Sequence, residues 1–128
     1  MFSQEVRNAL SNGSVIDITT KGRKSGEPRR IEIAFHNIDG RVYIAGMPRP
    51  RPRDWLANME ADPAFTFHLK RDVVADLPAK ARPIKEGPER GQILTKVLAN
   101  WRASNTQRVL EEGDVMKNSP LVEVTFDQ

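Results

Sequence analysis

The feature that most constrains this chain is a strict alternation of apolar and polar residues. Across residues 30–36, isoleucine, isoleucine and phenylalanine occupy every second position, which is the period of a strand with one buried face. Asp39-Gly40 follows, and this dipeptide tolerates the positive φ angles of a tight hairpin turn. Residues 41–45 then return as a second strand. The alternation therefore predicts an antiparallel sheet with one face in the core.

Similar short segments occupy most of the chain. Pro78 and Pro83 interrupt the fifth of them, and because proline lacks an amide donor they predict an edge or bent strand. Residues 103–118 are polar and poorly periodic, with a partial helix expected around residues 108–112. The predicted order β-β-β-α-β-β-α-β indicates one mainly β domain with flanking helices (α+β), folded as a small antiparallel barrel over residues 1–128. The strands are expected at residues 15–20, 30–36, 41–45, 65–69, 73–84 and 121–126, and the helices at 54–61 and about 88–102.

Composition limits the chemistry that the chain can use. It has no cysteine, which excludes disulfides, thiolate metal sites and a cysteine nucleophile. No apolar stretch has the length of a signal peptide or a membrane span, so we expect a cytoplasmic protein without integral membrane contact. His36 and His68 are the only histidines, and each lies on the polar side of a strand without metal-ligand spacing. We therefore expect both to be solvated and predict no metal site.

Positive charge is concentrated in two runs that flank the first hairpin. Net charge is only +3, so the placement of the charges rather than their total points to an anionic ligand. Each run by itself has an ordinary interpretation, a solvated loop for the first and a proline-stiffened surface connector for the second. Because both flank the same strand pair, we hypothesise that they converge on one groove. The first run comprises Lys21, Arg23, Lys24, Arg29 and Arg30, and the second comprises Arg49, Arg51 and Arg53.

Two further details favour a ligand near these runs. In residues 21–29, here named the basic loop, Gly22 and Gly26 allow turns that bring backbone amides close to a ligand, and Ser25 adds a hydroxyl. After the second run, Trp55 and Asn58 are three residues apart and share one helix face. Trp55 is expected in the core, whereas a buried amide at Asn58 needs hydrogen-bond partners, and a cofactor is one candidate.

Two segments of the chain match longer motifs. Residues 18–29 read ITTKGRKSGEPR, and residues 54–63 read DWLANMEADP. The first looks like the signature TT-x-GRKSG-x-PR of the deazaflavin-dependent nitroreductase family, and the second is similar to the helix W-x-x-N-L-x-A-N-P of the same family. The resemblance covers about residues 15–69. It implies the fold of the split β-barrel flavin and deazaflavin oxidoreductases, which is FMN-binding-like.

The resemblance also implies a redox cofactor, coenzyme F-420 (a deazaflavin), with FMN as the alternative. Its phospholactyl-glutamate tail would lie against the basic loop, where Arg23, Lys24 and Arg29 match the positions that hold phosphate and carboxylates. Ser25 and Gly26 would add close contacts. The other implied cofactor-binding residues are Ala45, Gly46 and Met47 beside the deazaflavin ring, and Trp55 and Asn58, which would support the groove.

The implied reaction is hydride transfer from reduced coenzyme F-420 to a nitro compound, a quinone or an enone, in which the protein binds and orients. No catalytic side chain is assigned. Residues 46–49 read GMPR where the family usually has SKGG, and the C-terminal tyrosines of the family have no counterpart. The alternative is therefore a split barrel that binds FMN, haem or lipid without this activity.

The expected partners follow from the same reasoning. A small-molecule cofactor and a substrate are expected, and nucleic acid is not, because stacking aromatic residues are scarce on the polar faces of the strands. Split barrels of this kind often dimerise, so a homodimer is expected by analogy.

Overall fold

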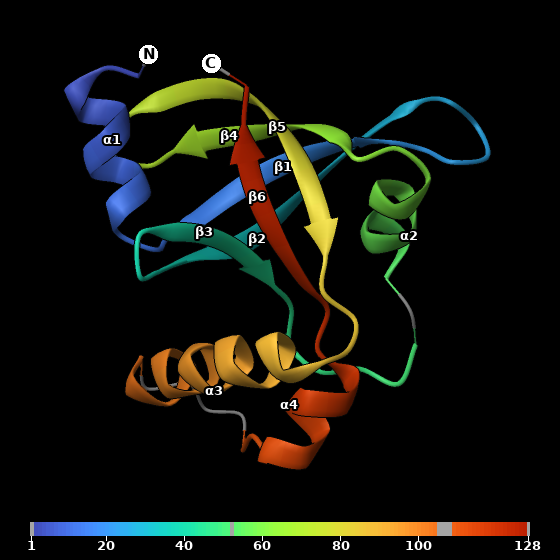
Figure 1. The fold of residues 1–128 in the computed structure, drawn as a ribbon. Helices are drawn as coiled ribbons and strands as arrows, with labels where there is room; N and C mark the ends of the chain where they lie inside the picture. The colour runs from blue at the N-terminus through green and yellow to red at the C-terminus, as the bar shows by residue number, and fades with distance from the viewer. Residues whose placement is uncertain (1, 52, 105–108, 128) are drawn as a thin grey trace.

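The computed structural model describes residues 2–51, 53–104 and 109–127. Its strands close into an antiparallel barrel in the order β1-β2-β3-β6-β5-β4, with β4 pairing back to β1 (Figure 1). Helices lie at both ends of the barrel and along one side. The strands are β1 (Val15–Lys21), β2 (Pro28–Ile38), β3 (Arg41–Ala45), β4 (Ala64–Lys70), β5 (Val74–Pro83) and β6 (Leu121–Phe126), and the helices are α1 (Gln4–Ser11), α2 (Asp54–Ala61), α3 (Pro88–Ala103) and α4 (Glu112–Asn118).

Strand β2 changes its partner along its length, and this change opens the barrel wall. Residues 28–34 pair with β1, and residues 35–38 pair with β3. Because the β2–β3 ladder ends at the pair of Phe35 with Ile44, the chain that leaves β3 does not continue beside the first half of β2. A split is therefore left between the first half of β2 and the segment that follows β3.

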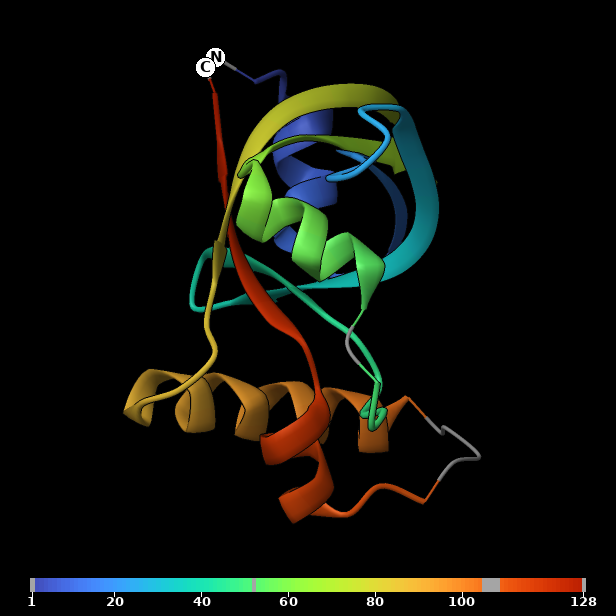
Figure 2. The same cartoon turned by 90° about the vertical axis from the view of Figure 1, so that its right-hand side faces the viewer.

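The barrel interior is filled by the inward side chains of alternate strand residues. Ile16, Ile18 and Phe67 are completely buried, and Phe35 meets Phe67 edge to face with ring centroids 5.2 Å apart. A second apolar cluster lies on the outer side of the barrel, where α3 and α4 pack together (Figures 1 and 2). Its largest fully buried side chains are Tyr43, Leu94, Val97, Val115 and Leu121.

Helices α1 and α2 lie at opposite ends of the barrel and contribute to the same core (Figure 1). α1 begins after Ser3, whose hydroxyl accepts a hydrogen bond from the amide of Val6 at 3.2 Å. Val6 and Leu10 are four residues apart, so they share the face that packs on the barrel. α2 contributes Met59 to the core from the other end. The position of α2 matters for function, because it places its remaining polar face against the basic loop.

The predicted fold class is confirmed, as are the order of the strands and the presence of α2 and α3. The prediction omitted α1 and α4, which have 8 and 7 residues. Helices of this length are marginal alone and depend on tertiary packing, so propensity is a weak signal for them. The expected partial helix around residues 108–112 starts later, since residues 109–111 are not helical and residue 108 lies outside the described residues.

Of the two alternatives predicted for β5, an edge strand or a bent strand, the edge strand is wrong, because β5 pairs with both β4 and β6. The two prolines are tolerated for a positional reason. Pro78 faces β6 at the end of that strand, where its carbonyl accepts from the amide of Asp127 at 3.0 Å. Pro83 faces β4 beyond the start of that strand, because Ala81 already bonds to Pro63. At both positions, a missing amide removes no interior ladder bond.

Candidate functional site

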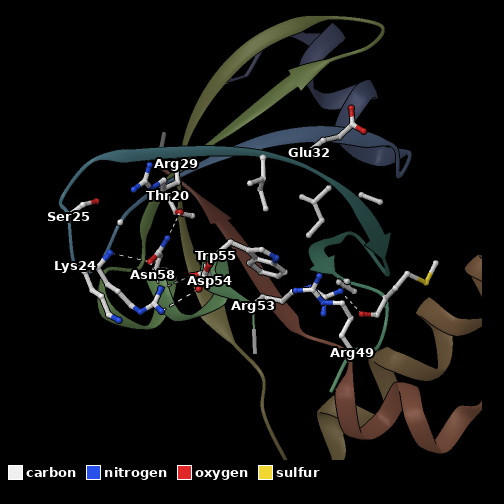
Figure 3. Close-up of a pocket in the computed structure, with 18 of the residues that line it drawn as sticks. Thr20, Lys24, Ser25, Arg29, Glu32, Arg49, Arg53, Asp54, Trp55 and Asn58 are labelled. Atoms are coloured by element: carbon white, nitrogen blue, oxygen red, sulfur yellow. Dashed lines mark hydrogen bonds and ion pairs between the residues drawn. The ribbon is translucent and has the colours of Figure 1, made fainter. Parts of the chain in front are cut away.

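A pocket of about 840 Å³ occupies the split in the barrel wall. Its walls come from the basic loop, the first half of β2, the segment that leaves β3, and α2. Figure 3 shows Lys24, Ser25 and Arg29 at one end of this pocket, Arg49 and Arg53 at the other end, and Trp55 between the two groups. Part of each basic run therefore reaches the same pocket, whereas Lys21 and Arg30 of the first run and Arg51 of the second do not line it.

One wall of the pocket is a strand edge. The amide of Phe35 donates to the carbonyl of Ser14 at 2.9 Å, so Phe35 and every second residue before it bond toward β1. The backbone groups of Glu32 and Ala34 consequently face the split, and both residues line the pocket. Within the described part of the chain, no strand pairs with this edge. The edge therefore offers amide donors and carbonyl acceptors to a planar ligand.

The basic loop is held in place by the buried side chain of Asn58, which is only 3% exposed. Its Nδ2 donates to Oγ1 of Thr20 at 3.1 Å. Its Oδ1 accepts from the backbone amide of Arg23 at 3.1 Å and from Nη1 of the same residue at 3.0 Å. Asn58 thus uses three of its four hydrogen-bonding positions within the protein itself, so its role is to position the loop.

The loop is also rigid within itself. The amide of Gly22 donates to the carbonyl of Glu27, and the amide of Gly26 donates back to the carbonyl of Gly22, both at 2.8 Å. Gly26 has a φ of 74°, a left-handed conformation that favours glycine. The hydroxyl of Ser25 accepts from the amide of Glu27 at 3.1 Å. These bonds fix the backbone from which the cationic side chains of the loop extend.

The cations of the basic loop differ in their partners. Nη2 of Arg23 lies 3.4 Å from the carboxylate of Asp54, which is 92% exposed, so this ion pair is weak. Lys24 and Arg29 have no ion-pair partner among the residues that the structure describes. These two side chains keep their charge available at the pocket end, where an anionic group would be attracted.

The far end of the pocket is shaped by the close packing of Gly46. A Cβ atom there would lie 2.9 Å from Cγ of Pro120 and 3.2 Å from Nη2 of Arg53, so a larger residue would force these neighbours to shift. Nη2 of Arg53 in turn donates to the carbonyl of Met47 at 2.5 Å. This packing explains why glycine stands where the resemblance predicts a serine.

The middle of the pocket is apolar. Ile31, Ile33 and Ala34 from β2 lie on one side, and Trp55 from α2 lies on another. Trp101 reaches the same pocket from α3, although its spacing in the sequence indicates an ordinary core residue. A flat aromatic ligand would bury its faces against these side chains.

The predicted cofactor-binding residues are largely brought together. All of them except Gly26 line the pocket, and Gly26 lines two smaller neighbouring cavities instead. Arg49 and Arg53 of the second basic run also line the pocket, as the hypothesis of one shared groove expects, and so does Gly22 of the basic loop. The remaining lining residues were not predicted. They are Thr20, Ile31, Glu32, Ile33, Ala34, Asp54 and Trp101.

The prediction of solvated histidines is wrong, because His36 and His68 are each only 7% exposed. His68 lies between two strands, with Nε2 2.7 Å from Oγ1 of Thr19 and Nδ1 2.7 Å from the carboxylate of Asp76. Its hydrogen bond lowers the pKa of Asp76. His36 packs edge to face on Trp101, and burial lowers the pKa of its imidazole to about 4. Both histidines lie on the polar face of their strand, but side chains from neighbouring strands cover His68 and Trp101 of α3 covers His36.

Two features are absent from the described residues. Among them, no helix is both long and apolar enough to cross a membrane. Nor do the described histidine, aspartate and glutamate side chains form a group of three or more that could hold a metal ion.

Comparisons with known proteins show a family and a shared fold. A family model described as F420H(2)-dependent quinone reductase matches residues 2–112. A solved structure described as "F420 Reductase" has a TM-score of 0.71 at 12% identity, covering 100% of this chain and 97% of that one. A conserved hypothetical protein from Mycobacterium tuberculosis has a TM-score of 0.69 at 16% identity, covering 100% and 82%. An F420-H2 dependent reductase, FDR-A, has a TM-score of 0.55 at 22% identity, covering 87% and 93%. At these identities the solved structures establish a shared fold.

Proposed function

Because this chain belongs to the F420H(2)-dependent quinone reductase family, we propose that its pocket binds reduced coenzyme F-420. Membership of this family makes the protein a deazaflavin-dependent oxidoreductase with coenzyme F-420 as its cofactor. In our proposal, the bound cofactor transfers a hydride to a small quinone, enone or nitro compound. The resemblance in the sequence to a deazaflavin-dependent family is thereby confirmed. One observation carries the proposal for the pocket: the rigid basic loop and an apolar middle section share a single cavity.

The chemistry of the pocket residues fits the cofactor. The tail of coenzyme F-420 carries a phosphate and carboxylates, which require positively charged hydrogen-bond donors. Lys24 and Arg29 supply such donors at one end of the pocket, and Arg23 lies next to them. The deazaflavin ring is planar and largely apolar on its faces, and the side chains of Ile31 and Trp55 can cover such a ring.

The chain's own residues would bind, orient and exclude water. The cofactor supplies the hydride when it is bound. The unpaired edge at Glu32 and Ala34 offers backbone donors and acceptors for the polar rim of the ring, which would set its orientation. Trp55 and Trp101 would keep water away from the reacting face. A quinone acceptor that takes up one hydride and one proton from water leaves as the hydroquinone.

The proposal is tested by titrating the purified protein with coenzyme F-420, and with FMN for comparison, using cofactor fluorescence. The informative variant is Lys24→Glu/Arg29→Glu, because neither side chain has an ion-pair partner among the described residues. Loss of two charge-assisted contacts of about 1.5 kcal/mol or more each should raise the Kd at least about 100-fold.

The matched control is Arg71→Glu/Lys80→Glu, which changes the net charge equally at two exposed positions outside the pocket. Its Kd should stay within about threefold of the wild-type value, because exposed charges far from the ligand are screened by salt. Equal affinity of wild type and the Lys24→Glu/Arg29→Glu variant would remove the basic loop from the proposal.

We also propose that the chain forms a homodimer, as split barrels often do. Light scattering coupled to size-exclusion chromatography gives the mass directly. A mass of a single 14.5 kDa chain at micromolar concentration would contradict this expectation.

A further inference from the structure

A second group of cations lies at the end of the pocket away from the basic loop. Arg49 and Arg53 line the main pocket at this end. An adjoining cavity of about 220 Å³ is lined by Arg51, Lys85 and Lys117, and Arg53 lines this cavity too. The two cavities therefore meet at Arg53. We name Arg49, Arg51, Arg53, Lys85 and Lys117 the second cationic cluster.

This cluster carries more positive charge than nearby acids compensate. None of the described residues that line the smaller cavity is acidic. Lys85 pairs with Glu60 at 2.9 Å, but Arg49, Arg51 and Lys117 have no carboxylate within ion-pair distance among the residues described. Like charges that gather without counter-ions repel one another, so the cluster gains stability from a bound anion.

A neighbouring arginine shows what a purely structural cation looks like in this cavity. Arg90 donates to the carbonyls of Met116, Ile84 and Ser119 at 3.0, 2.8 and 2.6 Å. Its donors are thus largely used within the protein, and burial lowers its pKa. Arg49 and Lys117 are exposed instead and make no such contacts in the described chain, so their donors are available to a ligand.

The position of the cluster argues against use by the cofactor tail. Figure 3 places Arg49 and Arg53 on the opposite side of Trp55 from Lys24 and Arg29. In coenzyme F-420 the glutamates are attached beyond the phosphate, on its far side from the ring. If the phosphate binds the basic loop and the ring covers the apolar middle section, the glutamates lead away from the second cationic cluster. The cluster then borders the space through which an acceptor reaches the ring.

We propose that the second cationic cluster binds an anionic group on the electron acceptor, so that the substrate class is a quinone or enone bearing a carboxylate, sulfonate or phosphate. This inference rests on the function proposed above. Arg49 is the first contact, because it lines the pocket and is exposed, while Arg53 is held by the carbonyl of Met47 and supplies a fixed positive field. Lys117 and Arg51 extend the site for a longer acceptor.

The test compares two acceptors with matched rings: menadione, which is neutral, and naphthoquinone sulfonate, which is anionic. The measured quantity is the ratio of kcat/KM for the anionic acceptor to kcat/KM for the neutral one, because a ratio cancels any general effect on hydride transfer. In Arg49→Gln/Lys117→Gln this ratio should fall about tenfold, the effect of one charge-assisted contact at a partly exposed site. Arg71→Gln/Lys80→Gln is the control of equal charge change, and its ratio should match the wild type.

Binding provides a second measurement that needs no turnover. The protein–cofactor complex is titrated with naphthalene sulfonate, which cannot be reduced, and cofactor fluorescence reports its binding. The Kd of this anion should rise about tenfold in Arg49→Gln/Lys117→Gln, while the Kd of coenzyme F-420 stays within about twofold.

Each remaining outcome has one meaning. An unchanged acceptor ratio and an unchanged naphthalene sulfonate Kd overturn the inference. A weaker coenzyme F-420 Kd with an unchanged ratio also overturns it, because the cluster would then hold the cofactor tail. Failure of wild type to bind coenzyme F-420 at all is a failure of the proposed function instead, and the titration of wild type identifies it before any variant is compared.

Discussion

Replacing Asn58 by alanine removes three hydrogen bonds of α2, two to Arg23 of the basic loop and one to Thr20 of β1. The side chain of Asn58 is almost fully buried, so water cannot simply take its place. The change leaves the hydroxyl of Thr20, itself 3% exposed, without its donor. It also leaves the backbone amide of Arg23 without its acceptor, and Arg23 is the residue through which Asn58 holds the basic loop.

The magnitude follows from these contacts. Two bonds between neutral groups contribute about 1 kcal/mol each, and the guanidinium bond contributes about 1 kcal/mol after a discount for the partial exposure of Arg23. The free energy of unfolding should therefore fall by about 3 kcal/mol. For a chain of this length that loss corresponds to a decrease in Tm of about 10 °C.

Urea denaturation followed by tryptophan fluorescence measures the change, and coenzyme F-420 titration measures its consequence for the site. Thr20→Val is the matched control, because it removes only one of the three bonds and should cost about 1 kcal/mol. The two residues contact each other, so the double variant should lose less than the sum of the single variants.

Two results would refute this reasoning about Asn58. One is a loss of unfolding free energy in Asn58→Ala no larger than that in Thr20→Val, which would mean that the bonds to Arg23 contribute nothing. The other is full retention of coenzyme F-420 affinity at a temperature where the variant is completely folded. The loop would then hold its geometry without Asn58, against the positioning role assigned to it.

Two further predictions concern packing and pH. Gly46→Ala should lower the free energy of unfolding by about 1–3 kcal/mol, because the added Cβ would press on Pro120. Gly91→Ala is the control: no atom lies within 4 Å of its added Cβ, so thermal denaturation should show a neutral or stabilising change. For His36 the folded pKa of about 4 lies below the usual 6.5, so the unfolded chain binds more protons between these values and stability falls as pH drops through that window. Relative to His36→Gln, the wild type should lose roughly 3 kcal/mol between pH 6.5 and 4 in urea titrations, and a constant difference between the two proteins would contradict the burial argument.

Local pattern was sufficient for most of the secondary structure. Alternation in residues 30–36 and the Asp39-Gly40 turn predicted β2, its turn and β3, because the period of a strand is a property of consecutive residues. Proline in β5 misled the prediction for the opposite reason. Whether a missing amide matters depends on which neighbouring strand it faces, and only the ladder of β5 with β4 and β6 answers that.

Candidate site residues show the same division. Arg23, Lys24 and Arg29 could be selected from the sequence, because charge and glycine spacing are visible in one loop. Trp101 could not, since it lies more than seventy positions from the basic loop and its helical spacing is that of a core residue. It reaches the pocket only because α3 packs beside β2, which is a consequence of long-range burial.

The sequence by itself determined the order of the strands along the chain, the hairpin turn with positive φ angles at Asp39-Gly40, and the family motifs. Each of these depends on residues that are adjacent in the chain. Only the tertiary structure determined where β2 changes its pairing from β1 to β3, and therefore where the split lies. It also determined the burial of both histidines and the separation of the cations into two groups at opposite ends of the pocket. The physical reason is that a side chain's neighbours across a sheet come from strands distant in sequence, so its exposure and its charge environment exist only once those strands have paired.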